Sequence, residues 1–183
     1  MENNNDRDKP KNEALEWIKS IGIAVVVAFF IKTFIFNSTY VLGNSMHPTL
    51  HEKDRLFATK VSLYFSGPDR GEIIVLEAPD DQNKDYIKRV IGIEGDKIQI
   101  KNGKVYLNDE LLEEDYIEDD AYTMVYNNID TWIVPEGEVF VLGDNRYEGA
   151  SKDSRYFGSI SLDLVKGITG FRYYPFNDGF GRI

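Results

Sequence analysis

The longest apolar segment of the chain runs from Ser20 to Phe36 and is interrupted only by Lys32. Its residues 21–31 are apolar on every face of a helix, whereas a helix that packs on a globular core has one apolar face. These 17 residues would rise roughly 25 Å as a helix, slightly less than a bilayer core of roughly 30 Å, and extension back to Leu15 closes the difference. The pattern predicts a single uncleaved transmembrane anchor over residues 20–36.

A cleaved signal peptide and a buried core helix are the two other interpretations of this segment. A cleaved signal peptide would need small residues near its end, but this segment ends in Phe34-Ile35-Phe36-Asn37. The residues before Ser20 include four bases, and basic residues favour a cytoplasmic side whereas acids contribute little. We therefore predict a cytoplasmic tail over residues 1–19 and an outer domain over residues 37–183.

Beyond residue 36 the hydrophobic pattern is mainly that of short β-strands. The clearest hairpin has alternating residues on both sides of Asn102-Gly103, a pair that suits a type I′ turn. Residues 109–128 are acidic and rich in tyrosine, and they fit a loop or a small appended ribbon. The predicted strands cover residues 55–59, 72–76, 97–101, 104–107, 139–142 and 168–174, the last stopped by Pro175.

Composition narrows the possible functions. The 183 residues leave room for the anchor and one modest domain, and the absence of cysteine excludes a disulfide scaffold and cysteine metal ligands. The first 36 residues hold five bases and five acids, so the net charge of −10 lies entirely beyond them. An acidic outer domain argues against nucleic-acid binding and against broad electrostatic adhesion to anionic lipid.

Ser45 is a candidate nucleophile because of the residues around it. Gly43 allows the backbone a positive φ, and Pro48 stiffens the exit from the turn. A nucleophile needs an exposed hydroxyl on such a fixed turn, with its own N–H directed into the site. The same tripeptide is also compatible with an ordinary Gly-Asn-Ser turn.

A serine hydroxyl becomes reactive only when a base removes its proton. The two histidines, His47 and His51, lie too close along the chain to fold back easily onto Ser45. Lys88 lies inside the apolar run 86–92, where desolvation can lower its pKa well below about 10.4 and leave the amine neutral. Lys88 is therefore the predicted base, and a lysine that reaches solvent from a sheet edge is the alternative.

A second polar cluster follows the strand at 139–142. Asp153 and Arg155 carry opposite charges two residues apart and can brace each other, and Ser151 can form a hydrogen bond with a neutral lysine. The alternative is a polar surface turn with a weak exposed ion pair. No group of His, Asp and Glu has metal-ligand spacing and no glycine loop resembles a P-loop, so we predict no metal and no cofactor.

Taken in order, these motifs resemble the successive conserved boxes of bacterial type I signal peptidases, and the single anchor and short acidic insert are most similar to the Gram-positive form. Each box alone is weak, but four in the family's order are specific. The boxes are Gly43-x-Ser45-Met46-x-Pro48-Thr49-Leu50, Asp54-Arg55, Lys88-Arg89-Val90-Ile91-Gly92-x-x-Gly95-Asp96, and Gly143-Asp144-Asn145-Arg146 with Ser151-x-Asp153-Ser154-Arg155.

The resemblance implies a serine endopeptidase with a Ser/Lys dyad that removes signal peptides from exported preproteins at the outer face of the cytoplasmic membrane. It implies a largely antiparallel β catalytic domain with a smaller inserted β region, about residues 97–135 in this chain. Its partners would be preproteins and the lipid bilayer. By matching position, Ser45 is the acylated nucleophile, Lys88 the general base, Ser151 the serine that orients the lysine, Asp153 and Arg155 the bracing pair, and Arg89 the arginine after the base.

The sequence departs from the family pattern at two places. Gly43 stands where some relatives carry a serine hydroxyl that completes the oxyanion hole, so a replacement donor is expected. The spacing from Arg146 to Ser151, which includes Tyr147-Glu148-Gly149-Ala150, is longer than the usual spacing of the family.

Two other functions compete with the peptidase. A self-cleaving Ser/Lys switch of the repressor type would need a DNA-binding segment and an internal cleavage site, and the acidic domain and the anchor oppose it. A membrane-anchored β-rich module that only binds or assembles partners needs no dyad.

Overall fold

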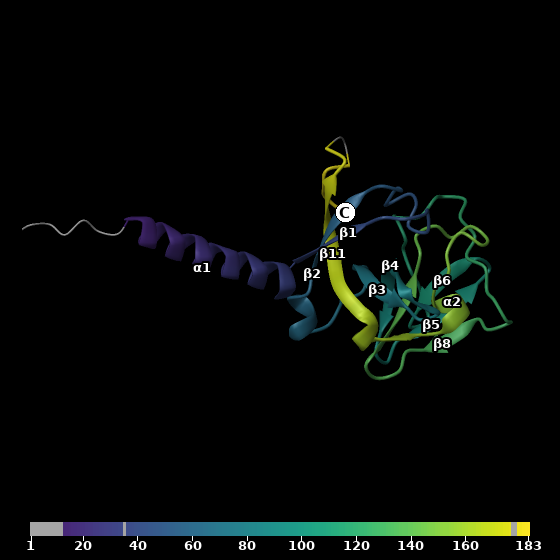
Figure 1. The fold of residues 1–183 in the computed structure, drawn as a ribbon. Coiled ribbons are helices and arrows are strands. Elements are labelled where there is room, and N and C mark those ends of the chain that lie inside the picture. Colours follow the sequence, from purple (N-terminus) through teal and green to yellow (C-terminus); the bar gives the residue numbers. More distant parts are fainter. Residues whose placement is uncertain (1–12, 35, 177–178) are drawn as a thin grey trace, which may run out of the picture. The chain divides into compact units, whose positions relative to one another are not determined.

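The computed structural model describes residues 13–34, 36–176 and 179–183. The chain divides into two units, residues 1–35 and residues 36–183. The first unit contains α1 (Glu13–Phe34), and the second contains the β-strands (Figure 1). Most of the predicted cytoplasmic tail, residues 1–12, lies outside the described residues.

The helix α1 is apolar through its middle and charged near both ends. Glu16 and Lys19 precede the uncharged residues 20–31, and Lys32 follows them. Across the described part of the chain, no helix combines the length and the hydropathy that crossing a membrane requires. The transmembrane helix predicted over residues 20–36 is therefore not found among the described residues.

The larger sheet is antiparallel throughout. Its strands follow the order β1-β2-β11-β3-β4-β9-β10, and β12 pairs with β11. Phe36, expected in the anchor, begins the first of these strands. The strands are β1 (Phe36–Tyr40), β2 (Arg55–Thr59), β3 (Ile73–Ala78), β4 (Asp81–Ile93), β9 (Glu138–Leu142), β10 (Ile160–Ser161), β11 (Val165–Tyr174) and β12 (Gly181–Arg182).

A smaller antiparallel sheet has the strand order β7-β6-β5-β8. The predicted hairpin is confirmed, with β5 (Lys97–Lys101) and β6 (Lys104–Leu107) joined at Asn102 and Gly103, whose φ angles are 52° and 76°. The two edge strands of this sheet are β7 (Glu110–Leu111), which pairs with β6, and β8 (Thr131–Ile133), which pairs with β5. The chain is thus mainly antiparallel β, as the sequence pattern predicts.

Three short helical turns occur among the described residues of the second unit. They are η1 (Ser62–Tyr64), α2 (Ser154–Phe157) and η2 (Leu162–Leu164). The turn α2 begins immediately after Asp153, whose side chain accepts a hydrogen bond from the backbone N–H of Arg155. A capping carboxylate of this kind satisfies a backbone donor that the helix itself cannot pair.

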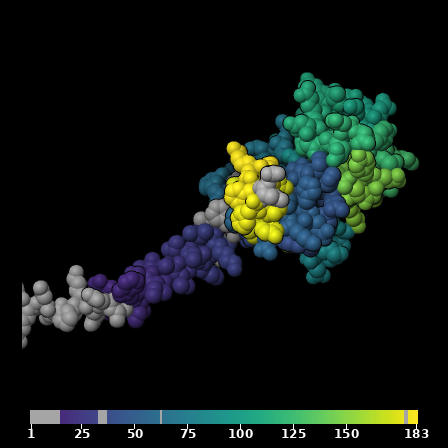
Figure 2. Space-filling model, turned by 90° about the horizontal axis from the view of Figure 1, so that it is seen from above, coloured from purple at the N-terminus to yellow at the C-terminus, as the bar shows by residue number. Residues whose placement is uncertain are grey.

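The buried apolar residues form separate clusters, which lie in different parts of the fold. One joins the two sheets, because Phe140 and Leu142 of β9 pack with Ile98 and Val105 of the smaller sheet. Another surrounds the segment after β1, where Met46 and Leu50 are almost completely buried. In Figure 2 this segment is blue and lies between the yellow C-terminal strand and the green and yellow-green residues. The segment that carries Ser45 is therefore held to the core by Met46 and Leu50.

Candidate functional site

Ser45 lies on a turn whose shape depends on two glycines. Gly43 has a φ of 82°, a conformation that side chains rarely adopt. Gly143 approaches so closely that a Cβ atom there would collide with the carbonyl oxygen of Ser45 and with the Ser151 hydroxyl. The same carbonyl accepts a hydrogen bond of 3.0 Å from the backbone N–H of Asn145. The turn after β9 thus holds the Ser45 backbone in place.

The Lys88 amine lies against the Ser45 hydroxyl. Lys88 projects from β4 and is 2% exposed, and its Nζ atom lies 2.8 Å from Ser45 Oγ and 2.9 Å from the carbonyl oxygen of Ile87. A general base must lie within hydrogen-bond reach of the proton that it removes, a separation of about 3 Å between the heavy atoms. Of the predicted site residues, these two are therefore brought into direct contact.

Burial lowers the pKa of Lys88 to about 8, because the ammonium form loses its hydration inside the protein. The negative charges of Asp153 and Asp144 act in the opposite direction, and Arg155 adds to the lowering. A pKa of about 8 leaves roughly a tenth of the amines neutral at pH 7. The lysine can therefore accept a proton near neutral pH, as a general base must.

The alternative base, His47, is directed elsewhere. Its Nδ1 atom lies 3.6 Å from a carboxylate oxygen of Glu118, and its ring packs edge-on against His51 at 5.2 Å between centroids. In the described structure the hydrogen-bond partner of the Ser45 hydroxyl is Lys88. The geometry favours the lysine over the histidine.

Asp153 and Arg155 form a completely buried ion pair with two hydrogen bonds of 2.8 Å each. Burial alone would raise the pKa of Asp153, but the Arg155 guanidinium and the N–H of Gly143 hold it below its usual range. The N–H of Gly143 donates to Asp153 over 3.1 Å. The pair braces the turn that carries Gly143, instead of forming the exposed ion pair of the alternative interpretation.

The orienting role expected of Ser151 stays a prediction, and its hydroxyl lies apart from the hydrogen bonds of the lysine. Its hydroxyl is buried and packs against Gly143, and among the described residues it makes no hydrogen bond with Lys88. The second partner of the amine is the carbonyl oxygen of Ile87. The segment between Arg146 and Ser151, residues 147–150, is longer than the usual spacing of the family.

Arg89 points away from the dyad and fixes Asp144. Its guanidinium donates two hydrogen bonds to that carboxylate, of 2.9 and 2.7 Å, and a third of 2.7 Å to the carbonyl oxygen of Gly71. Asp144 also accepts a hydrogen bond of 2.5 Å from Thr49, four residues after the nucleophile. Arg89 therefore links β4, the turn after β9 and the nucleophile segment.

A groove of about 490 Å³ contains both members of the dyad. One side is formed by residues 39–42 at the end of β1 and the other by residues 83–88 of β4. β1 is an edge strand, and β4 pairs with β9 only from Arg89 onward, so both sides offer backbone groups unpaired within the sheet. The arrangement can receive an extended peptide beside Ser45.

A family model described as signal peptidase, peptidase S26, matches residues 14–174. The chain belongs to this family of signal peptidases. The family membership confirms the resemblance drawn from the four motif boxes.

Several signal peptidases of Gram-positive bacteria are similar to this member of the family over nearly its whole length. Signal peptidase I of Bacillus licheniformis is 38% identical over 92% of this chain and 92% of its own. Signal peptidase I S of Bacillus subtilis (strain 168) is 38% identical and signal peptidase IB of Staphylococcus aureus (strain COL) 37%, each over 92% of this chain and 93% of its own. A solved signal peptidase I from Enterococcus faecalis V583, 32% identical, covers 55% of this chain and 95% of its own with a TM-score of 0.47.

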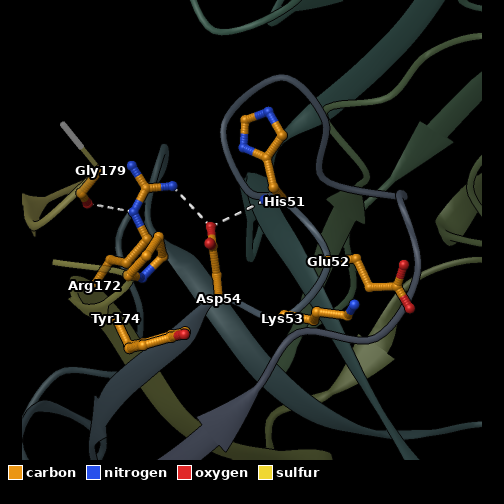
Figure 3. Close-up of a pocket in the computed structure, with 8 residues that line it drawn as sticks. His51, Glu52, Lys53, Asp54, Arg172, Tyr174 and Gly179 are labelled. Carbon is orange, nitrogen blue, oxygen red and sulfur yellow. Dashed lines mark hydrogen bonds and ion pairs between the residues drawn. The ribbon is translucent and has the colours of Figure 1, made fainter. Parts of the chain in front are cut away.

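The sequence analysis did not identify the ion pair between Asp54 and Arg172, which holds the end of the nucleophile segment of this signal peptidase that lies farther from Ser45. Asp54, in a cavity of about 610 Å³, accepts hydrogen bonds from Arg172 of β11 over 2.7 Å and from the N–H of His51 over 3.0 Å (Figure 3). Arg172 also donates to the carbonyl oxygens of Thr49 and Gly179. The motif Asp54-Arg55 signalled the acid, but its partner lies 118 residues away.

Proposed function

We propose that this protein is a serine endopeptidase that removes N-terminal signal peptides from exported preproteins, with Ser45 as nucleophile and Lys88 as general base. The observation that carries the proposal is the 2.8 Å contact between the buried Lys88 amine and the Ser45 hydroxyl. It occurs in a chain that belongs to the signal peptidase family. A non-catalytic binding module would have no need of a desolvated amine at this position, since burial of an ammonium is unfavourable.

The reaction follows from the position of each group. The neutral amine of Lys88 takes the Ser45 proton while the oxygen attacks the scissile carbonyl, and the resulting ammonium then protonates the leaving amine. Among the described residues the N–H of Ser45 has no assigned acceptor, so it is available to the oxyanion. Water completes hydrolysis of the acyl-enzyme, with Lys88 again as base, and the alcohol of Ser45 is restored.

The preprotein would bind as an extended strand in the groove between β1 and β4. Backbone groups at both open edges can form hydrogen bonds with such a peptide. The scissile carbonyl would then lie over Ser45. We propose, from the resemblance to the family, that the residues at positions −1 and −3 of the signal peptide are small, as alanine is.

The direct test is incubation of the purified full chain in detergent with a secretory preprotein, followed by N-terminal sequencing of the products. We expect one cut, after a small residue at the end of the signal peptide. A preprotein that stays intact although the protein binds it would favour the non-catalytic module. Cleavage of this chain itself, with no cleavage of the preprotein, would favour the self-cleaving switch.

We propose further that α1 attaches the protein to the cytoplasmic membrane, with residues 1–19 on the cytoplasmic side and residues 37–183 on the outer side. Support comes from its uncharged residues 20–31, which are apolar on all faces, and from Trp17, which suits the headgroup region. Lys19 and Lys32 would then reach toward polar surroundings.

Flotation with liposomes tests this attachment. The unaltered chain is expected to float with the vesicles, whereas a chain with Val26→Asp and Phe29→Asp is expected to remain in solution because charges are costly in lipid. The matched control adds the same two charges at Asn127 and Asn128, both exposed in the second unit, and should still float. Flotation of all three proteins would show that attachment does not depend on α1.

A further inference from the structure

A buried arginine connects the turn beside Ser45 to the loop that follows β7. Arg146 is 1% exposed and donates to the carbonyl oxygen of Gly143 over 2.8 Å. It also donates to the Thr123 hydroxyl, at 3.0 Å, and to both carboxylate oxygens of Glu114, one of them at 3.1 Å. Glu114 belongs to the smaller β region and its side chain is 6% exposed. A buried guanidinium is therefore neutralised from outside the catalytic sheet.

The same loop covers a second arginine of the site. The ring centroid of Tyr116 lies 3.9 Å from the guanidinium carbon of Arg89, and the Tyr116 hydroxyl donates to Glu114 over 2.7 Å. In Figure 2 the green residues of this region lie beside the yellow-green turn. Tyr116 thus contacts Arg89, the residue adjacent to Lys88. Glu114 contacts Arg146, which belongs to the turn that holds the Ser45 carbonyl.

We propose that Glu114 and Tyr116 are positioning residues, through which the loop of the smaller β region sets the geometry of the Ser45–Lys88 pair. The inference rests on the proposed function. Neither residue lines the groove, so each would act through an arginine: Glu114 through Arg146, and Tyr116 through Arg89.

Glu114 would act by holding the turn 143–146. Without its carboxylate, the buried Arg146 charge has no opposite partner, and an unpaired buried charge forces its surroundings to rearrange. Gly143 and Asn145 of the same turn contact the Ser45 carbonyl, so such a shift reaches the nucleophile. A displacement of about 1 Å can lower a catalytic rate by about 10². Because the groove itself stays intact, the loss should fall on kcat and leave KM largely unchanged.

Tyr116 would act on the charge balance around Lys88. The amine is surrounded by the Tyr86 ring at 5.2 Å and by the charges of Asp144, Asp153 and Arg155. Asp144 raises the pKa of Lys88, and Arg89 neutralises Asp144 beneath the Tyr116 ring. Loss of the ring admits water to the Arg89–Asp144 pair and weakens their attraction. The pKa of Lys88 should then rise.

The experiment compares Glu114→Gln, Tyr116→Phe and Tyr116→Leu in the full chain, with a peptide that spans a cleavage site as substrate. For Glu114→Gln we expect kcat to fall by about tenfold to a hundredfold, with KM within about twofold. Tyr116→Phe keeps the ring over Arg89 and should retain most activity. Tyr116→Leu should shift the acidic limb of the kcat–pH profile to higher pH.

The control is Arg70→Gln, which removes the partly exposed partner of the buried Asp96, away from the turn 143–146. It should lower the melting temperature while kcat and the pH profile stay unchanged. If Glu114→Gln fails to fold, the comparison of Tyr116→Leu with Tyr116→Phe decides the outcome. Folded variants with unaltered kcat and pH profile would overturn the proposal. An inactive unaltered chain would instead overturn the proposed function.

Discussion

Replacement of Ser45 by alanine is expected to abolish preprotein cleavage, with kcat/KM lower by at least about 10⁴. The substitution removes the oxygen that forms the acyl-enzyme, and water would have to attack directly without the aligned alcohol. Burial of the neighbouring Met46 is untouched, so the fold should be retained. The measurement is the initial cleavage rate of a purified preprotein, with the melting temperature as a check on folding.

The matched control is Ser66→Ala, which removes an exposed serine hydroxyl outside the groove and should leave the rate unchanged. Ser151 is the other serine near the dyad, but its hydroxyl is buried and it does not line the groove. Unchanged cleavage by the Ser45→Ala protein would mean that another group is the nucleophile, and the Ser45–Lys88 mechanism would be wrong.

Local patterns were sufficient for the strands whose apolar residues alternate or cluster within a few positions. Residues 55–59 form β2 as predicted, and the hairpin over 97–107 has the predicted turn. The first half of β4, Asp81 to Asp85, could not be predicted, because its residues are polar. There the extended shape depends on pairing with β3 and on ion pairs such as Lys166 with Asp85, 81 residues away.

The contacts of the candidate site are likewise of two kinds, those that local motifs predict and those that only the folded chain brings together. The contact between Ser45 and Lys88 and the bracing of Asp153 by Arg155 follow from residue types within recognisable motifs. The partner of Arg89 could not be predicted, since Asp144 is 55 residues distant and only the folded sheet brings them together. The acidic run 109–128 gave no sign that one of its carboxylates would be buried against an arginine.

Two expectations depend on geometry that residue types alone do not determine. The role expected of Ser151 depends on where its hydroxyl points, and that hydroxyl lies against Gly143. The expected anchor depends on the length and hydropathy of the whole helix, and Glu16, Lys19 and Lys32 flank its uncharged residues 20–31. A motif indicates the residue types, whereas the surrounding fold determines their positions.

Replacement of Lys88 by methionine is expected to lower kcat by about 10³ or more, because the general base is lost while the volume and apolar character of the side chain are kept. Arginine at the same position should be equally inactive, since a guanidinium stays protonated throughout the accessible pH range. The matched control is His47→Ala, which removes the alternative base and should retain kcat. If the His47→Ala protein lost activity and the Lys88→Met protein kept it, His47 and not Lys88 would be the general base.

The pH dependence of the unaltered enzyme tests the same assignment without mutation. Burial lowers the pKa of Lys88 to about 8, and the neutral amine is the active form. Activity should therefore be low well below pH 8, rise through that value, and level off above it. A rise centred near 6.5 would indicate a histidine base, and a rise near 10 or higher would indicate a hydrated lysine. A midpoint near 8 would agree with the desolvated amine of Lys88 and with neither of these alternatives.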